Sequence, residues 1–322
     1  MMFNVFDCGA RGGKHRSWKS VDLEYDYYMF EPEGEEFKQL EIHGDGANKI
    51  INAAVSDKEG QQKLNIYSDE SLSSLLEIDK SQAYRFRNIT LVEQIDVNVT
   101  TISNICDTFN IVPHFMSIDV QGLSFEVLKG TGKYLCQSLA IRVEAEFFPF
   151  YKQEKTIFEL GSWLNCEGFE LVRLETCGPG HFGVSSDMNH YSVDSDDAKP
   201  MWSDCIFLNV RYIEELIKKR SKPDFVLAVL VFMVHNHCGY QALKYLFLLE
   251  VSYLSDASKS ILSSSLPLFY YYLNLPRIDY NKHQNYNSEL FHLESMMKDM
   301  KVENKLSETT LEKINSIYLT TS

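Results

Sequence analysis

Short apolar runs, each ending in an acidic residue, recur along the first part of the chain. Residues 3–7, 27–31, 115–119 and 139–146 are too short for helices, and each closes with Asp or Glu. Runs of this length predict buried strands. Segments with helical periodicity lie between them, for example residues 156–166. This alternation is typical of an α/β fold with a mostly parallel sheet.

Three more segments complete the predicted sheet. Residues 50–55, 169–174 and 204–210 predict strands, and the last two lack a helix between them. Two strands joined in this way predict an antiparallel pair. We therefore expect a Rossmann-like, doubly wound sheet of seven mostly parallel strands with an antiparallel last strand. This sheet defines a predicted domain at residues 1–210.

The chain between the third and fourth strands of this sheet is less regular. Residues 62–67 and 97–99 predict short additional strands, whereas residues 68–95 lose their periodicity and predict a loop or lid. A helix is predicted at residues 102–109, with Thr100 or Thr101 as its N-cap.

Beyond residue 210 the pattern changes to helices without strands. Helical periodicity is found at residues 212–220, 225–234, 240–254 and 289–300. We expect residues 211–322 to form a helical extension with a polar, frayed tail, which docks a partner or a second copy of the chain. The ten apolar residues at 225–234 predict a buried helix, since a bilayer requires about twenty. No signal peptide is predicted, because strand-like sequence begins almost at Met1.

Composition narrows the classes of function. A net charge of -14 disfavours non-specific binding to nucleic acid, which depends on clustered Lys and Arg. The seven cysteines occur singly, without the close pairs of a zinc site, which predicts reduced thiols and a cytoplasmic location.

The loop after the first predicted strand favours a small-molecule pocket. Asp7 is followed by Gly9, Gly12 and Gly13, so the backbone can approach a ligand closely. The Gly-x-Gly-x-x-Gly pattern of dinucleotide sites is absent, and a leading carboxylate suits the ammonium group of S-adenosylmethionine. Glu31 follows Asp7 by 24 residues, at the strand tip where an acid binds ribose hydroxyls. The strand end at Ser56 and Asp57 is predicted to contact adenine.

Five motifs in order resemble the FkbM-type S-adenosylmethionine-dependent methyltransferases. They are Asp7-Cys8-Gly9-Ala10-Arg11-Gly12-Gly13, Phe30-Glu31-Pro32, Ala54-Val55-Ser56-Asp57, Ile118-Asp119-Val120-Gln121-Gly122 and Val143-Glu144. The resemblance covers roughly residues 3–210.

The resemblance implies roles for particular residues. Asp7, Gly9, Ala10 and Gly13 match the loop at the methionine side of the donor, and Glu31 matches the ribose-binding acid. Two further positions depart from the family pattern: Arg11 stands where Asn is usual, and Gln121 stands where Glu is common. The implied activity is O-methylation of a sugar, glycan or small natural product.

Methyl transfer to a hydroxyl requires alignment and removal of a proton. Asp119 is the first candidate for the base, followed by Glu144 and Glu146. His181 and His190 are weaker candidates on a long polar loop. No Asp-Asp or Asp-Asn pair completes a magnesium cage, so no metal site is predicted.

Two other functions stay open at this point. An NAD-linked enzyme would use the same sheet and ribose acid. A non-catalytic binding module would keep the fold, and the departures at Arg11 and Gln121 leave room for it. The sequence does not identify the acceptor or separate O- from N-methylation.

Overall fold

The computed structural model describes residues 3–15, 23–43, 49–82, 89–180 and 199–236, with isolated positions at 18 and 21 and between 238 and 262. The chain forms two compact units. One comprises Met2–His15 and Tyr25–Tyr212, and the other comprises Met1, Arg16–Glu24 and Ile213–Ser322.

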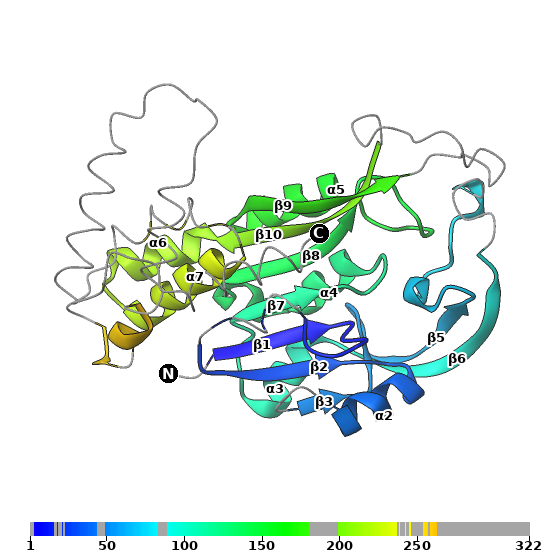
Figure 1. Cartoon of the computed structure of the whole chain (residues 1–322), viewed down its shortest axis with the longest axis horizontal. Coiled ribbons are helices and arrows are strands. Elements are labelled where there is room, and N and C mark those ends of the chain that lie inside the picture. The colour runs from blue at the N-terminus through cyan, green and yellow to red at the C-terminus, as the bar shows by residue number, and fades with distance from the viewer. Residues whose placement is uncertain are drawn as a thin grey trace, which may run out of the picture. The chain divides into compact units, whose positions relative to one another are not determined.

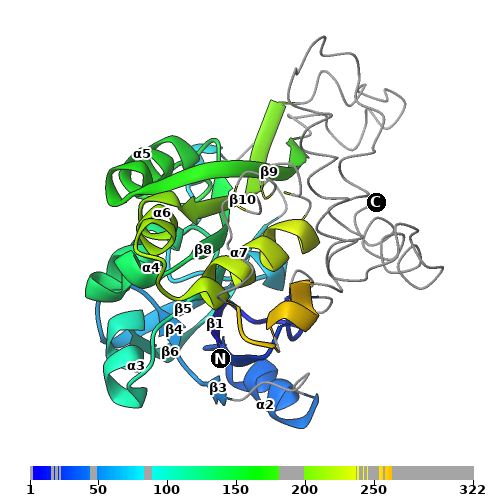
Figure 2. The ribbon, with the colours of Figure 1, turned by 90° about the vertical axis from the view of Figure 1, so that its left-hand side faces the viewer.

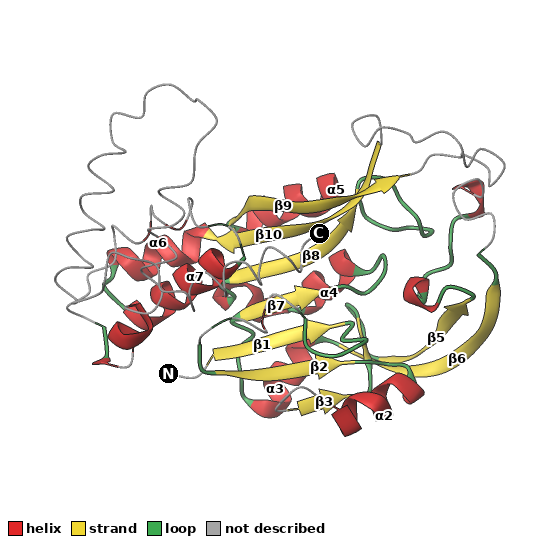
Figure 3. Ribbon diagram, viewed as in Figure 1, coloured by secondary structure: helices red, strands yellow, loops and turns green. Residues whose placement is uncertain are grey.

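A seven-stranded sheet forms the centre of the larger unit (Figures 1 and 3). Its strands, in spatial order, are β3 (Lys49–Ile51), β2 (Tyr25–Phe30), β1 (Phe3–Cys8), β7 (Phe115–Ile118), β8 (Ala140–Glu146), β10 (Lys199–Asn209) and β9 (Phe169–Gly180). The first five run parallel, and β10 is antiparallel to both β8 and β9. The predicted seven-stranded, mostly parallel sheet with an antiparallel last strand is therefore confirmed.

Helices lie on both sides of this sheet (Figure 2). Three of them, α3 (Ile102–Phe109), α4 (Ser124–Gly130) and α5 (Ile157–Glu167), cover one face, and α2 (Gly34–His43) lies on the other. Between α4 and β8 the chain forms a 3-10 turn, η3 (Gly132–Gln137). Alternate strand residues such as Phe6, Ile118 and Ile141 pack beneath the three helices in one buried apolar cluster. Helix α3 begins after Thr101, whose side chain accepts a hydrogen bond from the Asn104 N–H, as predicted for its N-cap.

A second, three-stranded sheet is inserted after β3, with the strand order β4 (Ala54–Val55), β6 (Leu91–Thr100), β5 (Gly60–Tyr67). The prediction of one strand at residues 50–55 was wrong, because the chain turns at Asn52 and its two halves join different sheets. The Asn52 side chain stabilises this turn by donating to the Glu31 carbonyl at 3.0 Å.

The predicted loop at residues 68–95 was also partly wrong. It contains two 3-10 turns, η1 (Glu70–Leu72) and η2 (Lys80–Gln82), but its last part belongs to β6. Residues 91–94 are exposed on both faces of that strand, so no alternation of apolar and polar residues marked it.

Helices α6 (Val210–Lys218) and α7 (Pro223–His235) follow the sheet. The α7 residues from Phe225 to Met233 are buried on every side, which confirms the predicted buried helix. Trp18 packs against Phe232 of this helix, with ring centroids 5.2 Å apart. Among the described residues, no helix combines the length and apolar character needed to cross a membrane. The helices predicted at 240–254 and 289–300, the tail, and His181 and His190 lie largely or wholly outside the described residues.

Candidate active site

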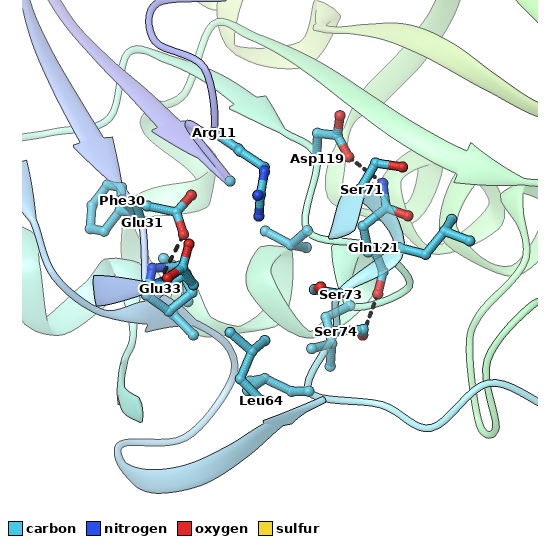
Figure 4. A pocket seen from close by; sticks show the side chains of 18 of the residues that line it. Arg11, Phe30, Glu31, Glu33, Leu64, Ser71, Ser73, Ser74, Asp119 and Gln121 are labelled. Carbon is cyan, nitrogen blue, oxygen red and sulfur yellow. Dashed lines mark hydrogen bonds between the residues drawn. The ribbon is translucent and has the colours of Figure 1, made fainter. Parts of the chain in front are cut away.

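The carboxyl ends of β1, β2, β7 and β8 lie side by side at one edge of the large sheet, and a cavity of about 580 Å³ opens there (Figure 4). This volume is within the range of small-molecule sites. Acidic side chains dominate the charges of its wall: Glu31, Glu33, Glu36, Glu70, Asp119, Glu144 and Glu146. Four strand ends thus supply one acid-lined cavity, as the alternation of strands and helices predicted.

The glycine loop after β1 is fixed between the ends of β2 and β7. The N–H groups of Gly9 and Ala10 both donate to the Phe30 carbonyl, at 3.1 and 3.0 Å, and the Asp119 N–H donates to the Cys8 carbonyl at 2.9 Å. Gly9 has a φ of +84°, and a Cβ there would lie 1.8 Å from the Asp119 carbonyl oxygen. Glycine is therefore required at this position by both conformation and space.

Gly12, farther along the same loop, presents its backbone to the cavity. Its N–H donates to Oε1 of Glu36 at 2.8 Å, and no atom lies within 4 Å of the position of an added Cβ. The loop therefore offers open backbone to a ligand.

Glu31 lies at the end of β2 with its side chain in the cavity wall (Figure 4). The residue is 4% exposed, and this burial raises the pKa of its carboxyl to about 7. One oxygen, Oε1, accepts a hydrogen bond from the Glu33 N–H at 2.9 Å. The other oxygen has no hydrogen-bond partner among the described residues, so it is available to a hydroxyl donor.

Gln121 joins two carboxylates on the opposite wall. Its amide nitrogen donates to Asp119 Oδ1 at 2.8 Å and to Glu144 Oε1 at 3.0 Å. Gln121 has a φ of 50° and precedes Gly122, also at positive φ, and this tight turn directs its side chain back between the strand ends. An amide can donate to both acids, whereas the Glu common at this position in the resembling family has no N–H to donate.

Burial and the proximity of other acids raise the pKa values of the carboxyl groups at this wall. Desolvation, and then the nearby Asp119 and Asp204 charges, raise the pKa of Glu144 to about 9. Asp119 is reached by solvent through the cavity, yet protein surrounds its other sides, and this desolvation also raises its pKa. Glu144 is therefore protonated near neutral pH, and Asp119 is the better proton acceptor of the two.

Two neighbouring groups complete the charge balance. Arg142, almost fully buried on β8, pairs with Asp204 at 2.7 Å and with Glu175 at 3.0 Å. Desolvation and the adjacent Glu154 raise the pKa of Glu146 well above its usual range, which favours its neutral form. No group of three or more His, Cys, Asp or Glu in the described part of the chain has the arrangement of a metal site.

A wall of the cavity that sequence reasoning did not identify comes from residues 71–75, after β5. The Ser74 hydroxyl donates to the Gln121 carbonyl at 2.6 Å, and the Tyr151 hydroxyl donates to the Leu72 carbonyl at 2.9 Å. Phe150 and Trp202 add aromatic surface to the same cavity. In the sequence, this wall was indicated only by the serines of residues 71–75, which interrupt a segment without clear periodicity.

The remaining predicted residues lie just outside the cavity lining. Asp7 accepts from the Tyr27 hydroxyl at 2.5 Å and from the His15 N–H at 3.2 Å, so it closes the base of the glycine loop. Ala10 is buried within that loop, and Gly13 donates its N–H to the Ala10 carbonyl.

Ser56 and Asp57 likewise follow the cavity residue Val55 without lining the cavity themselves. Ser56 is buried, and its N–H donates to the Thr100 carbonyl at 3.0 Å. Asp57 pairs with Lys129 at 3.5 Å. The structure thus brings Gly9, Glu31, Asp119 and Glu144 together around the cavity and leaves these two behind its wall.

Comparison with known proteins gives the family of this site. The model of the methyltransferase FkbM domain matches residues 7–171, just over half of the chain, and includes every strand end described above. The chain belongs to the FkbM methyltransferase family. Membership confirms the predicted resemblance and supports methyl transfer as the general activity of the chain.

Other comparisons add little to this assignment. A search of curated proteins gives no significant match. A solved structure, Sp1610 of Streptococcus pneumoniae, described as a candidate tRNA (m1A22) methyltransferase, is 11% identical, and the alignment covers 91% of each chain with a TM-score of 0.28.

Proposed function

We propose that this FkbM-family protein transfers the methyl group of S-adenosylmethionine to a hydroxyl group of a sugar, glycan or small natural product. The observation that carries the proposal is the single cavity shared by the glycine loop, Glu31, Asp119 and Glu144. The two ends of the cavity differ. At one end the backbone of the glycine loop is accessible and Glu31 can bind ribose hydroxyls, and at the other end Asp119 can accept a proton.

The residues present fit the methyl donor. Gly9 and Gly12 leave the backbone uncovered at the methionine side, and the Glu31 oxygen that accepts no hydrogen bond from a described residue suits a ribose hydroxyl. The acidic wall suits the positive charges of the sulfonium and the ammonium. Asp7 supports this end indirectly by closing the loop through His15. Ser56 and Asp57 lie behind the wall, so Val55 is the residue of this segment that can contact the adenine.

S-adenosylmethionine supplies an electrophilic methyl carbon on a sulfonium. The protein aligns the acceptor oxygen with that carbon, which is the main requirement of an in-line displacement. As the new C–O bond forms and the C–S bond breaks, Asp119 takes the hydroxyl proton. Gln121 holds Asp119 and Glu144 at fixed separation, and the protonated Glu144 can donate a hydrogen bond to a neighbouring oxygen of the acceptor.

The cavity wall supports a neutral, hydroxyl-bearing acceptor. Seven acidic side chains line the cavity, and even with Glu144 and Glu146 protonated the remaining acids would repel a phosphorylated or carboxylated acceptor. Carboxyl groups accept hydrogen bonds from hydroxyls, and Phe150 and Trp202 offer apolar faces against which a sugar ring can stack.

Labelled methyl transfer tests this function. The protein is incubated with S-adenosylmethionine carrying a radioactive methyl group and with an extract of its host, beside an Asp119→Asn variant as the matched control. We expect label in a neutral product from which mild alkali releases no methanol, since a methyl ether resists alkali and a methyl ester does not. Label in an amine, in an alkali-labile ester, or at equal levels with the control would refute the proposal.

A further inference from the structure

The charges of the cavity are strongly unbalanced. Among the described residues that line the cavity, seven are acidic and one is cationic, which is Arg11. The methionine moiety of the proposed donor is a zwitterion, with one ammonium and one carboxylate. The acidic side chains can bind the ammonium. The carboxylate of the same moiety would have no cationic partner among them, and binding an unpaired carboxylate beside other acids costs free energy.

Arg11 is placed to supply that partner. It lies between Ala10 and Gly12 in the glycine loop, and Figure 4 shows its side chain extending into the cavity, between Glu31 and the wall that carries Asp119. Its positive charge acts on Glu31, whose pKa it lowers against the larger effect of burial. The guanidinium therefore lies between Glu31, which is proposed to bind the ribose, and Asp119, which is proposed to act as the base.

The present partner of Arg11 is easily exchanged. Arg11 forms an ion pair with Glu70 of η1, and the two side chains are 35% and 66% exposed. Exposed ion pairs contribute little to stability, since water solvates both charges when they separate. Glu70 can therefore return to solvent when another carboxylate takes its place on Arg11.

We propose that Arg11 binds the carboxylate of the donor's methionine moiety, and so selects donors that carry that group. This inference rests on the proposed function. Guanidinium binds carboxylate through two parallel hydrogen bonds, a geometry that the neutral Asn usual at this position cannot reproduce. The departure from the family pattern at Arg11 is then a specificity feature of this chain.

Calorimetric binding of two ligands tests the proposal. One is S-adenosylhomocysteine, and the other is its decarboxylated analogue, which keeps the ammonium and loses the carboxylate. The proteins are the wild type, Arg11→Gln, Arg11→Lys and, as a charge-matched control, Lys63→Gln, which alters an exposed pair with Asp96 away from the cavity. Thermal unfolding of each variant verifies that it is folded.

In Arg11→Gln we expect weaker binding of S-adenosylhomocysteine by about tenfold to a hundredfold, and unchanged or tighter binding of the analogue. The ratio of the two affinities should shift partly in Arg11→Lys and not at all in Lys63→Gln. If the ratio of the two affinities is unchanged in Arg11→Gln, the role proposed for Arg11 is wrong, while the proposed function stands. Failure of the wild type to bind either ligand would overturn the proposed function itself, together with this inference.

Discussion

Protonation of Glu31 should control donor binding below neutral pH. Burial raises the pKa of this carboxyl to about 7, while Arg11 lowers it and the nearby Glu33 and Glu36 raise it. Two hydroxyls of a ribose donate most strongly to an ionised carboxylate. At a pH below about 7, therefore, the free protein must lose a proton from Glu31 before it binds the ligand well.

The size of the effect follows from this pKa. Each pH unit below about 7 should weaken the affinity about tenfold, which corresponds to about 1.4 kcal/mol. From pH 8 to pH 5 the dissociation constant should therefore rise about a hundredfold, and above pH 8 it should be level. In Glu31→Gln the group no longer titrates, so the affinity should be low and nearly independent of pH.

Isothermal titration of S-adenosylhomocysteine from pH 5 to pH 9 measures this profile. Its sulfur is uncharged, so the effect of Asp119 and Glu144 on its binding is reduced. Asp96→Asn serves as the control, because Asp96 is exposed and lies outside the cavity lining, and this variant should keep the slope. A flat wild-type profile, or an equal slope in Glu31→Gln, would refute the role given to Glu31.

Three further predictions test the base, the glycine loop and the buried acid behind it. Asp119→Asn should lower kcat by about a hundredfold or more while the affinity for S-adenosylhomocysteine stays within about threefold, and unchanged turnover would exclude Asp119 as the base. Gly9→Ala should lower the free energy of unfolding by about 3 kcal/mol, because its Cβ would overlap the Asp119 carbonyl. Gly34→Ala, where space is open, is its control, and equal denaturation midpoints would contradict the packing argument. Asp7 has its pKa raised by burial from 3.8 to about 6, so the wild type should lose up to about 3 kcal/mol relative to Asp7→Asn as pH rises from 4 to 7. Parallel stability curves in chemical denaturation would show that this carboxyl titrates normally.

The sequence was sufficient to predict the sheet and the acids at its edge. Buried parallel strands require continuous apolar runs, and their ends meet at one edge by topology, so the side chains of Glu31 and Asp119 could be placed without coordinates. The sequence predicted Gly9 as a position where the backbone approaches a ligand, and the structure adds that the Asp119 carbonyl after β7 leaves no space for a Cβ there.

Contacts between distant segments could not be predicted. The bridge of Gln121 between Asp119 and Glu144 depends on a turn at positive φ, and its carbonyl is held by Ser74, 47 residues earlier. The ion pair of Arg11 with Glu70 also joins segments with no shared pattern. Both faces of β6 near Leu91 are exposed, so periodicity carried no information about its start.

The position of bound S-adenosylhomocysteine in a crystal structure of the complex tests the account most directly. The predicted result is one ligand in the acid-lined cavity, with its ribose hydroxyls on Glu31, its amino-acid part over Gly9 and Gly12, and its sulfur directed toward Asp119. A ligand bound elsewhere on the chain, or a ribose that leaves Glu31 uncontacted, would contradict it.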